Sequence, residues 1–104
     1  IFNITISFII NMKFHVYMII TKKINKYITY VGYSKDIEKR LILHNSSKGA
    51  KFTKGNYWKI IYQKEYNSKS EAMRAEYNLK KNYKLRLKLK NKFISDENIN
   101  TTTL

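Results

Sequence analysis

Cysteine is absent from the 104-residue chain. Without thiols there can be no disulfide framework, no zinc site built on cysteines and no cysteine nucleophile. A cysteine-free chain suits a reducing compartment, so we expect a cytoplasmic protein. The length leaves room for one domain with a single modest core.

Acidic residues are also scarce. The chain has 7 Asp and Glu against 21 Lys and Arg, a formal net charge of +14. This excess goes far beyond what solubility requires. Because 43% of the residues are hydrophobic, the charge belongs to a folded domain and not to a disordered basic tail. A polyanion is therefore the expected partner.

The sequence lacks a hydrophobic run long enough to cross a bilayer. Its first twelve residues, IFNITISFIINM, are apolar but too short for a span, and they lack the basic leader and cleavage site of a secretory signal. The basic segments lack the broad apolar face of a membrane-surface helix. We therefore expect no membrane partner. We also expect an extension at residues 1–12, a domain at 13–92 and a polar tail at 93–104.

The first half of the domain has the pattern of a β-hairpin followed by a helix. Phe14–Ile20 and Tyr27–Tyr33 are rich in aromatic and β-branched residues and are separated by a polar stretch at 21–26. A helix is predicted next, because Ser34 is a capping-type residue and apolar side chains recur at helical spacing up to His44.

The second half predicts a loop, a strand and a helix. Residues 45–56 read as an exposed basic loop, and Tyr57–Glu65 returns to strand chemistry. Ser68 and Glu71 then form a capping box, which predicts a helix from about residue 70 to residue 83.

The segment from Lys80 to Lys92 contains seven basic residues and no acid. Its Leu85, Leu87 and Leu89 alternate with period two, which favours a strand by pattern. A basic helix would continue the preceding segment better, and we predict a helix here. The polar tail after it is expected to fray.

One acid stands out on the predicted second helix. Ala72, Met73, Leu79 and Tyr83 form its apolar stripe, and Glu76 falls on that stripe. A carboxylate in such a place needs a cation, either a basic side chain or a divalent metal. Taken alone, the pattern favours a salt bridge or a solvated acid over a metal ligand.

Four other polar residues are placed to converge. Arg40 and His44 are spaced i, i+4 and project from one helix face. Tyr17 and Tyr30 lie one on each arm of the hairpin, where cross-strand neighbours share a face. Each also has an ordinary explanation, since most such arginines are solvated and most tyrosines and histidines are packing residues.

Taken in order, short motifs along the chain resemble the signatures of GIY-YIG nucleases, and the later ones are similar to the small stand-alone bacterial members. Those members are similar to the catalytic subunits of branched-DNA nucleases. The motifs are Val16-Tyr17-Met18, Tyr30-Val31-Gly32, Asp36 to Asn45, Gly49 to Gly55, Trp58 to Tyr62 and Ser70 to Lys80.

The chain departs from the family pattern near its start. His15-Val16-Tyr17 stands where Gly-Ile-Tyr is usual, and twelve residues separate Tyr17 from Tyr30, slightly more than is typical of the family. A longer hairpin turn would absorb the difference. A register shift of one residue would not be tolerated, because it would send one tyrosine to the wrong face.

The resemblance implies an α/β fold, a three-stranded antiparallel sheet flanked by helices, and a metal-dependent DNA endonuclease. By this resemblance Glu76 holds Mg²⁺ or Mn²⁺, Tyr17 or His44 is the general base, Arg40 stabilises the phosphate and Tyr30 orients water or phosphate. Some members carry a late asparagine near the metal, for which Asn82 and Asn91 are candidates without assignment.

The expected substrate is DNA, branched or nicked, in a repair process, and a protein partner could supply specificity. Two alternatives stay open: a nucleic-acid-binding module of the same fold that has lost cleavage, and RNA as the ligand. Sequence-independent phosphate contacts are expected from basic side chains. These are Lys48, Lys51, Lys54, Lys80, Lys81 and Lys84.

Overall fold

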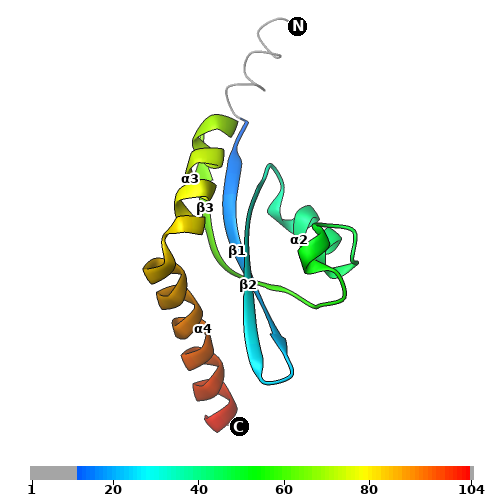
Figure 1. The fold of residues 1–104 in the computed structure, drawn as a ribbon, viewed down its shortest axis with the longest axis vertical. Helices are drawn as coiled ribbons and strands as arrows, with labels where there is room; N and C mark the ends of the chain where they lie inside the picture. The colour runs from blue at the N-terminus through cyan, green and yellow to red at the C-terminus, as the bar shows by residue number, and fades with distance from the viewer. Residues whose placement is uncertain (1–11, 104) are drawn as a thin grey trace, which may run out of the picture.

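The computed structural model describes residues 12–103 and contains an antiparallel sheet between helices (Figure 1). The strands follow the order β2-β1-β3, and both outer strands run antiparallel to β1. The predicted α/β class and three-stranded sheet are confirmed. The predicted extension at 1–12 lies, except for Met12, outside the described residues. The elements are β1 (Phe14–Lys23), β2 (Lys26–Ser34), α2 (Ile37–Asn45), the short 3₁₀ helix η1 (Lys51–Thr53), β3 (Lys59–Tyr66), α3 (Lys69–Lys81) and α4 (Tyr83–Thr103).

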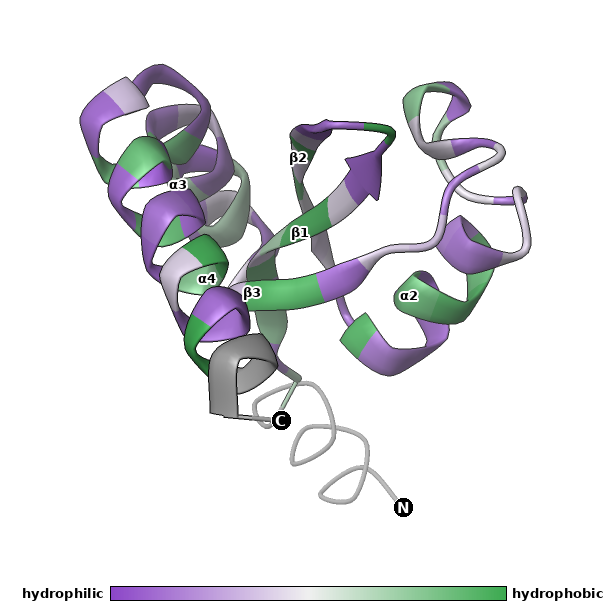
Figure 2. Ribbon diagram, turned by 90° about the horizontal axis from the view of Figure 1, so that it is seen from below, coloured by the Kyte–Doolittle hydropathy of each residue, from purple (hydrophilic) through white to green (hydrophobic). Residues whose placement is uncertain are grey.

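The central strand β1 is buried on both faces. Val16 and Met18 belong to one hydrophobic cluster, together with Ala72 of α3. Tyr17 and Ile19 point the other way, since side chains alternate along a strand, and they pack in a second cluster beside α2. Figure 2 shows the sheet between α3 and α4 on one side and α2 on the other. The domain therefore has two small cores that share β1.

The hairpin is longer and its turn tighter than the sequence pattern predicted. The strands pair up to Lys23 and Lys26, so only Ile24 and Asn25 form the turn, and most of the polar stretch at 21–26 belongs to the strands. Strand pairing needs only backbone N–H and C=O groups, so a polar stretch can continue a strand where the side-chain pattern predicts a turn. The extra length before Tyr30 is thus taken up by strand and not by a longer turn.

Helix α2 begins later than predicted. Its N-cap is Asp36, whose side chain accepts a hydrogen bond of 3.1 Å from the Lys39 backbone N–H. Ser34 ends β2, and its Oγ accepts a bond from the Asp36 N–H. The prediction of Ser34 as the cap was wrong, because a carboxylate two residues later accepts from one of the free N–H groups of the first turn.

The basic loop after α2 is folded against the domain. Trp58 is fully buried, and its indole N–H donates to the Thr53 carbonyl at 2.9 Å. The Asn45 side chain accepts from the Trp58 N–H and donates to the Trp58 carbonyl. These bonds hold η1 in place, and they delay the start of β3 to Lys59.

Helix α3 begins with the predicted cap, because Ser68 accepts a bond from the Glu71 N–H at 3.1 Å. The helix ends at Lys81, before the predicted residue 83. Its apolar stripe is also narrower than predicted. Ala72 and Leu79 are buried, whereas Met73 and Tyr83 are exposed.

The prediction of a helix over the basic segment is confirmed, and the same helix runs on through most of the predicted polar tail. Leu85 and Leu89 pack against the hydrophobic cluster that contains Ala72 of α3, while Leu87 is exposed. The two packed leucines are four residues apart, which is the spacing of one helix face, although leucine alternates along the sequence. Helix α4 continues to Thr103, and an ion pair of 3.8 Å between Lys59 and Glu97 ties it to β3. None of the helices over residues 12–103 is long and apolar enough to cross a membrane.

Candidate active site

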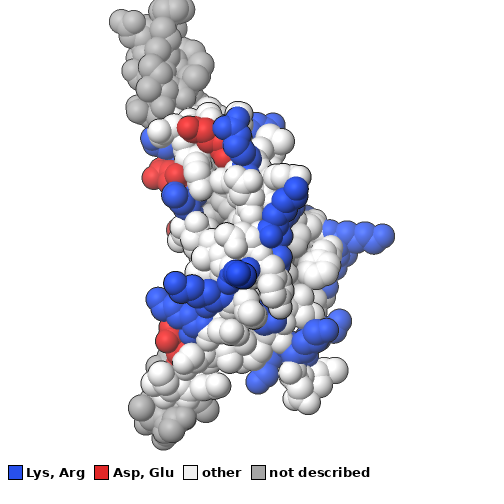
Figure 3. All heavy atoms as spheres, turned by 60° about the vertical axis from the view of Figure 1, so that its left-hand side comes forward, with Lys and Arg blue, Asp and Glu red and all other residues white. Residues whose placement is uncertain are grey.

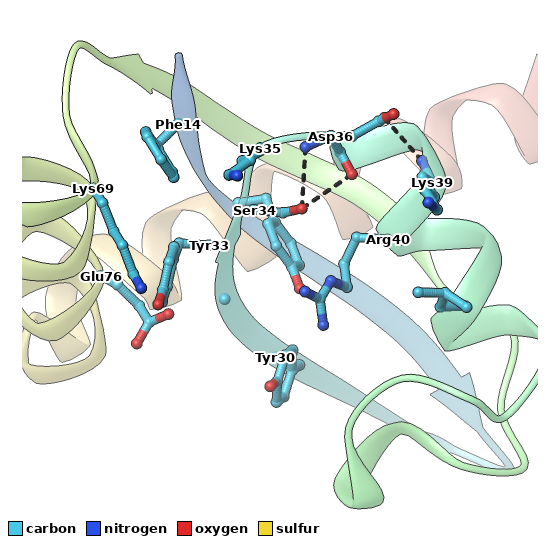
Figure 4. A pocket seen from close by; sticks show the side chains of 13 residues that line it. Phe14, Tyr30, Tyr33, Ser34, Lys35, Asp36, Lys39, Arg40, Lys69 and Glu76 are labelled. Carbon is cyan, nitrogen blue, oxygen red and sulfur yellow. Dashed lines mark hydrogen bonds between the residues drawn. The ribbon is translucent and has the colours of Figure 1, made fainter. Parts of the chain in front are cut away.

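A cleft of about 910 Å³ opens beside the edge strand β2, between α2 and α3 (Figure 4). Four of the predicted site residues line it. Tyr30 comes from β2, Arg40 from α2, Glu76 from α3 and Tyr17 from the neighbouring strand β1. Segments distant in sequence thus bring these four side chains to one cleft.

The pairing register places both tyrosines on one face of the sheet. Tyr17 lies opposite Gly32, and Ile19 lies opposite Tyr30. Since the offset is two residues, Tyr17 and Tyr30 are diagonal neighbours on the same side. The pairing of β1 with β2 is therefore not displaced by one residue, a shift that would have put one tyrosine on the other face. Tyr17 is only 3% exposed, so its ring forms the floor of the cleft.

Glycine is required at two positions by the rings of the site. A Cβ at Gly32 would lie 2.5 Å from the Tyr17 hydroxyl and 2.7 Å from Cζ. A Cβ at Gly49 would lie 2.5 Å from Nδ1 of His44. Two of the family-like motifs therefore supply the space that Tyr17 and His44 occupy.

His44 is buried behind Tyr17 in a chain of hydrogen bonds. The Thr53 hydroxyl donates to the Ala50 carbonyl at 2.8 Å, so its oxygen must accept from Nδ1 of His44, also at 2.8 Å. With the proton on Nδ1, Nε2 is free to accept. The Tyr17 hydroxyl donates to it at 2.8 Å. Thr53 lies within the Gly49 to Gly55 motif, but nothing in the sequence predicts its bond to His44.

The surroundings keep both partners of this bond neutral. Burial raises the pKa of Tyr17, the neighbouring Tyr30 raises it further, and Arg40 opposes the change. Burial also lowers the pKa of His44, and the Arg40 guanidinium adds to this effect. At neutral pH a protonated phenol therefore faces an unprotonated imidazole.

Glu76 has a partner within its own helix. Its side chain is 18% exposed and lies 3.1 Å from Nζ of Lys80, one turn further along α3. The salt bridge favoured for this residue in isolation is present. Glu76 nevertheless lines the cleft, on the side opposite Arg40 (Figure 4). No group of three or more His, Asp or Glu with metal-ligand geometry occurs among the described residues.

The lysines that line the cleft are not the predicted ones. Lys35, Lys39 and Lys69 line it directly. The six predicted lysines are all exposed. None of the six lines the cleft; Lys80 lines a neighbouring hollow, and Lys81 lies over the Tyr77 ring at 4.4 Å. Figure 3, which brings the side of α3 and α4 forward, shows lysine and arginine spread over that face of the molecule, with acids in only a few places.

Most of the described chain matches a known protein family. Residues 13–91 match the family described as the GIY-YIG catalytic domain. A UPF0213 protein of Staphylococcus saprophyticus is 50% identical over 52 residues, which are 49% of this chain and 63% of that protein. A UPF0213 protein of Staphylococcus epidermidis is 46% identical over 59 residues, 56% of this chain and 72% of that protein.

A UPF0213 protein of Streptococcus agalactiae is 50% identical over 48 residues, 45% of this chain and 54% of that protein. The chain thus spans less than two thirds of the first and third of these relatives. Their names state no activity. No solved structure matches the chain significantly.

Proposed function

Since the chain belongs to the GIY-YIG family of nuclease domains, we propose that it is a metal-dependent DNA endonuclease acting in the cleft beside β2. The observation that carries this proposal is the gathering of Tyr17, Tyr30, Arg40 and Glu76 around one cleft, with His44 hydrogen bonded behind Tyr17. These residues would divide the tasks of phosphodiester hydrolysis, which are metal binding, proton transfer from the attacking water and stabilisation of the phosphate.

Glu76 would hold Mg²⁺ or Mn²⁺. One carboxylate in a roomy cleft fits such an ion, because Mg²⁺ keeps several waters and uses few protein ligands together with substrate phosphate. When bound, the ion would neutralise charge on the phosphoryl oxygens and assist the leaving oxygen. Lys80 already pairs with this carboxylate. Repulsion from a second cation would turn its ammonium group toward a substrate phosphate.

The hydrogen bond between Tyr17 and His44 supports a general base made of both residues, and not of either one alone. The Tyr17 oxygen takes a proton from the attacking water while its own proton passes to Nε2 of His44. The water becomes hydroxide, the phenol stays neutral and the imidazole becomes imidazolium, still bonded to Thr53 through Nδ1. A free Tyr17 phenolate is disfavoured, since burial raises the pKa of this phenol.

Arg40 and Tyr30 would act on the phosphate. The Arg40 guanidinium lines the cleft and points toward Tyr30 (Figure 4), where it can donate to the non-bridging oxygens as negative charge builds. The Tyr30 hydroxyl would orient the water or the phosphate. A binding module without cleavage is the second candidate, supported by the exposed lysines and by the Glu76 pairing with Lys80.

The test is Glu76→Gln, which keeps the size of the side chain but removes its charge. Cleavage of nicked and branched DNA in Mg²⁺ or Mn²⁺ should be lost, while DNA binding persists because it rests on other residues. Glu71→Gln is the matched control, since Glu71 lies in the first turn of the same helix and not in the cleft. Circular dichroism checks folding.

Two results would decide against the proposal. A folded Glu76→Gln variant that cuts as fast as the parent would remove the metal assignment. A parent protein that binds these DNAs but cuts none of them under any metal would favour the binding module.

A further inference from the structure

Phe52 presents an aromatic face to solvent next to the active-site cleft. It is 60% exposed, although the next residue, Thr53, is fully buried. Its ring stacks on Tyr30, with centroids 6.0 Å apart and planes 21° apart. The bond from His44 to Thr53 fixes η1, so the Phe52 ring is held in position and not left on a free loop.

Phe52 also lines a hollow that adjoins the cleft. The hollow encloses about 360 Å³, and Tyr30 borders both spaces. Lys80 and Arg86 form its basic side. The Arg86 side chain is held there because its Nε donates to the Leu79 carbonyl at 3.1 Å. We call this space the Phe52 hollow; its remaining lining residues are Thr29 and Val31.

We propose that the Phe52 hollow binds one unpaired nucleobase of the substrate strand, next to the phosphate being cut. The base stacks on Phe52, and its phosphate contacts Lys80 and Arg86. An aromatic ring beside basic side chains matches both parts of a nucleotide, whereas phosphate contact alone would need no exposed ring. This inference rests on the proposed function, because it assigns a subsite to the same cleft.

The proposal has a consequence for substrate choice. Inside a duplex both faces of every base are covered by neighbouring bases, so only an unpaired nucleotide can stack on Phe52. DNA with unpaired nucleotides beside the cut, as in a gap, a flap or a single strand, should therefore bind better than continuous duplex of the same length.

The experiment measures binding without cleavage. Oligonucleotides carrying the fluorescent base 2-aminopurine are titrated without divalent metal, as a single strand and as a duplex. Phe52→Leu keeps an apolar side chain but removes the ring. It should weaken single-strand binding by about tenfold, as the loss of one base stack predicts, and should leave duplex binding unchanged.

Two further variants complete the test. Phe52→Trp should restore both the single-strand affinity and the change in 2-aminopurine fluorescence on binding, because indole also stacks on a base. Tyr57→Leu is the matched control, since Tyr57 is exposed but lines neither the cleft nor the Phe52 hollow. Equal single-strand affinity for Phe52→Leu and the parent would overturn the proposal, as would an equal loss on duplex. Failure of the nuclease assay would leave these binding results unaffected.

Discussion

At the level of single residues, the site is limited by space. The Tyr17 ring lies over Gly32, and no room remains for a methyl group between them. Gly32→Ala should therefore displace the phenol, destabilise the protein by about 1–3 kcal/mol as overpacking typically does, and abolish efficient cleavage. Thermal unfolding and a nicking assay measure the two effects.

A double variant tests the cause. If the clash is with the Tyr17 ring, Gly32→Ala should cost much less stability in a Tyr17→Ala background than alone, because the neighbour that must move is gone. Additive losses would show that the alanine collides with something else.

The His44 protonation state sets a pH dependence. In the proposed mechanism Nε2 must be unprotonated to accept a proton, and burial together with Arg40 lowers the pKa of His44 below its usual 6.5. Activity should be level at neutral pH and fall only as the pH drops through this lowered pKa. A profile of kcat/KM against pH, with an NMR titration of the ring, measures it.

Substitutions at Thr53 test whether the hydrogen bond to Nδ1 of His44 keeps Nε2 ready to accept a proton. Thr53→Val removes the acceptor of the Nδ1 proton, so kcat should fall, while Thr53→Ser should restore it. An acidic limb at or above pH 6.5 would show that His44 is not the group that titrates.

At the level of elements, the hairpin turn contains a poorly suited residue. Ile24 has a φ of 58° and is exposed, a backbone region that disfavours β-branched residues. Ile24→Gly should stabilise the fold by up to about 1 kcal/mol. The measurement is the free energy of unfolding in urea. Ile24→Ala keeps the Cβ and should gain little, so equal gains for both variants would argue against strain in the turn.

At the level of the whole molecule, the excess of positive charge should dominate affinity for DNA. Binding should weaken steeply as salt rises, because each lysine on a phosphate releases bound counterions. Replacing Lys48, Lys51 and Lys54 with alanine should reduce the slope of log affinity against log salt by about 2–3 if each contacts one phosphate. Fluorescence anisotropy over a salt series gives this slope.

The control for that prediction keeps the same change in net charge. Lys22, Lys23 and Lys26 are exposed at the tip of the hairpin, and their triple alanine variant should change the slope less. Equal slopes for the two triple variants would mean that net charge alone, and not a defined surface, attracts DNA.

The sequence alone predicted the features that depend on neighbours in the chain. The paired strands, the Ser68 cap and the amphipathic part of α3 follow from side-chain chemistry repeated at strand or helix spacing, which each short segment carries by itself. The motif order likewise indicated the family to which residues 13–91 belong.

Tertiary structure decided what depends on two distant segments meeting. Thr53 fixes His44 across nine residues, Phe52 stacks on Tyr30, and Gly32 is needed only because Tyr17 lies over it. Lys59 of β3 and Glu97 of α4 form an ion pair, although 38 residues separate them in the sequence. None of these contacts has a periodic pattern, because each exists only once the central strand is buried from both sides and brings the helices and the loop to fixed places around it.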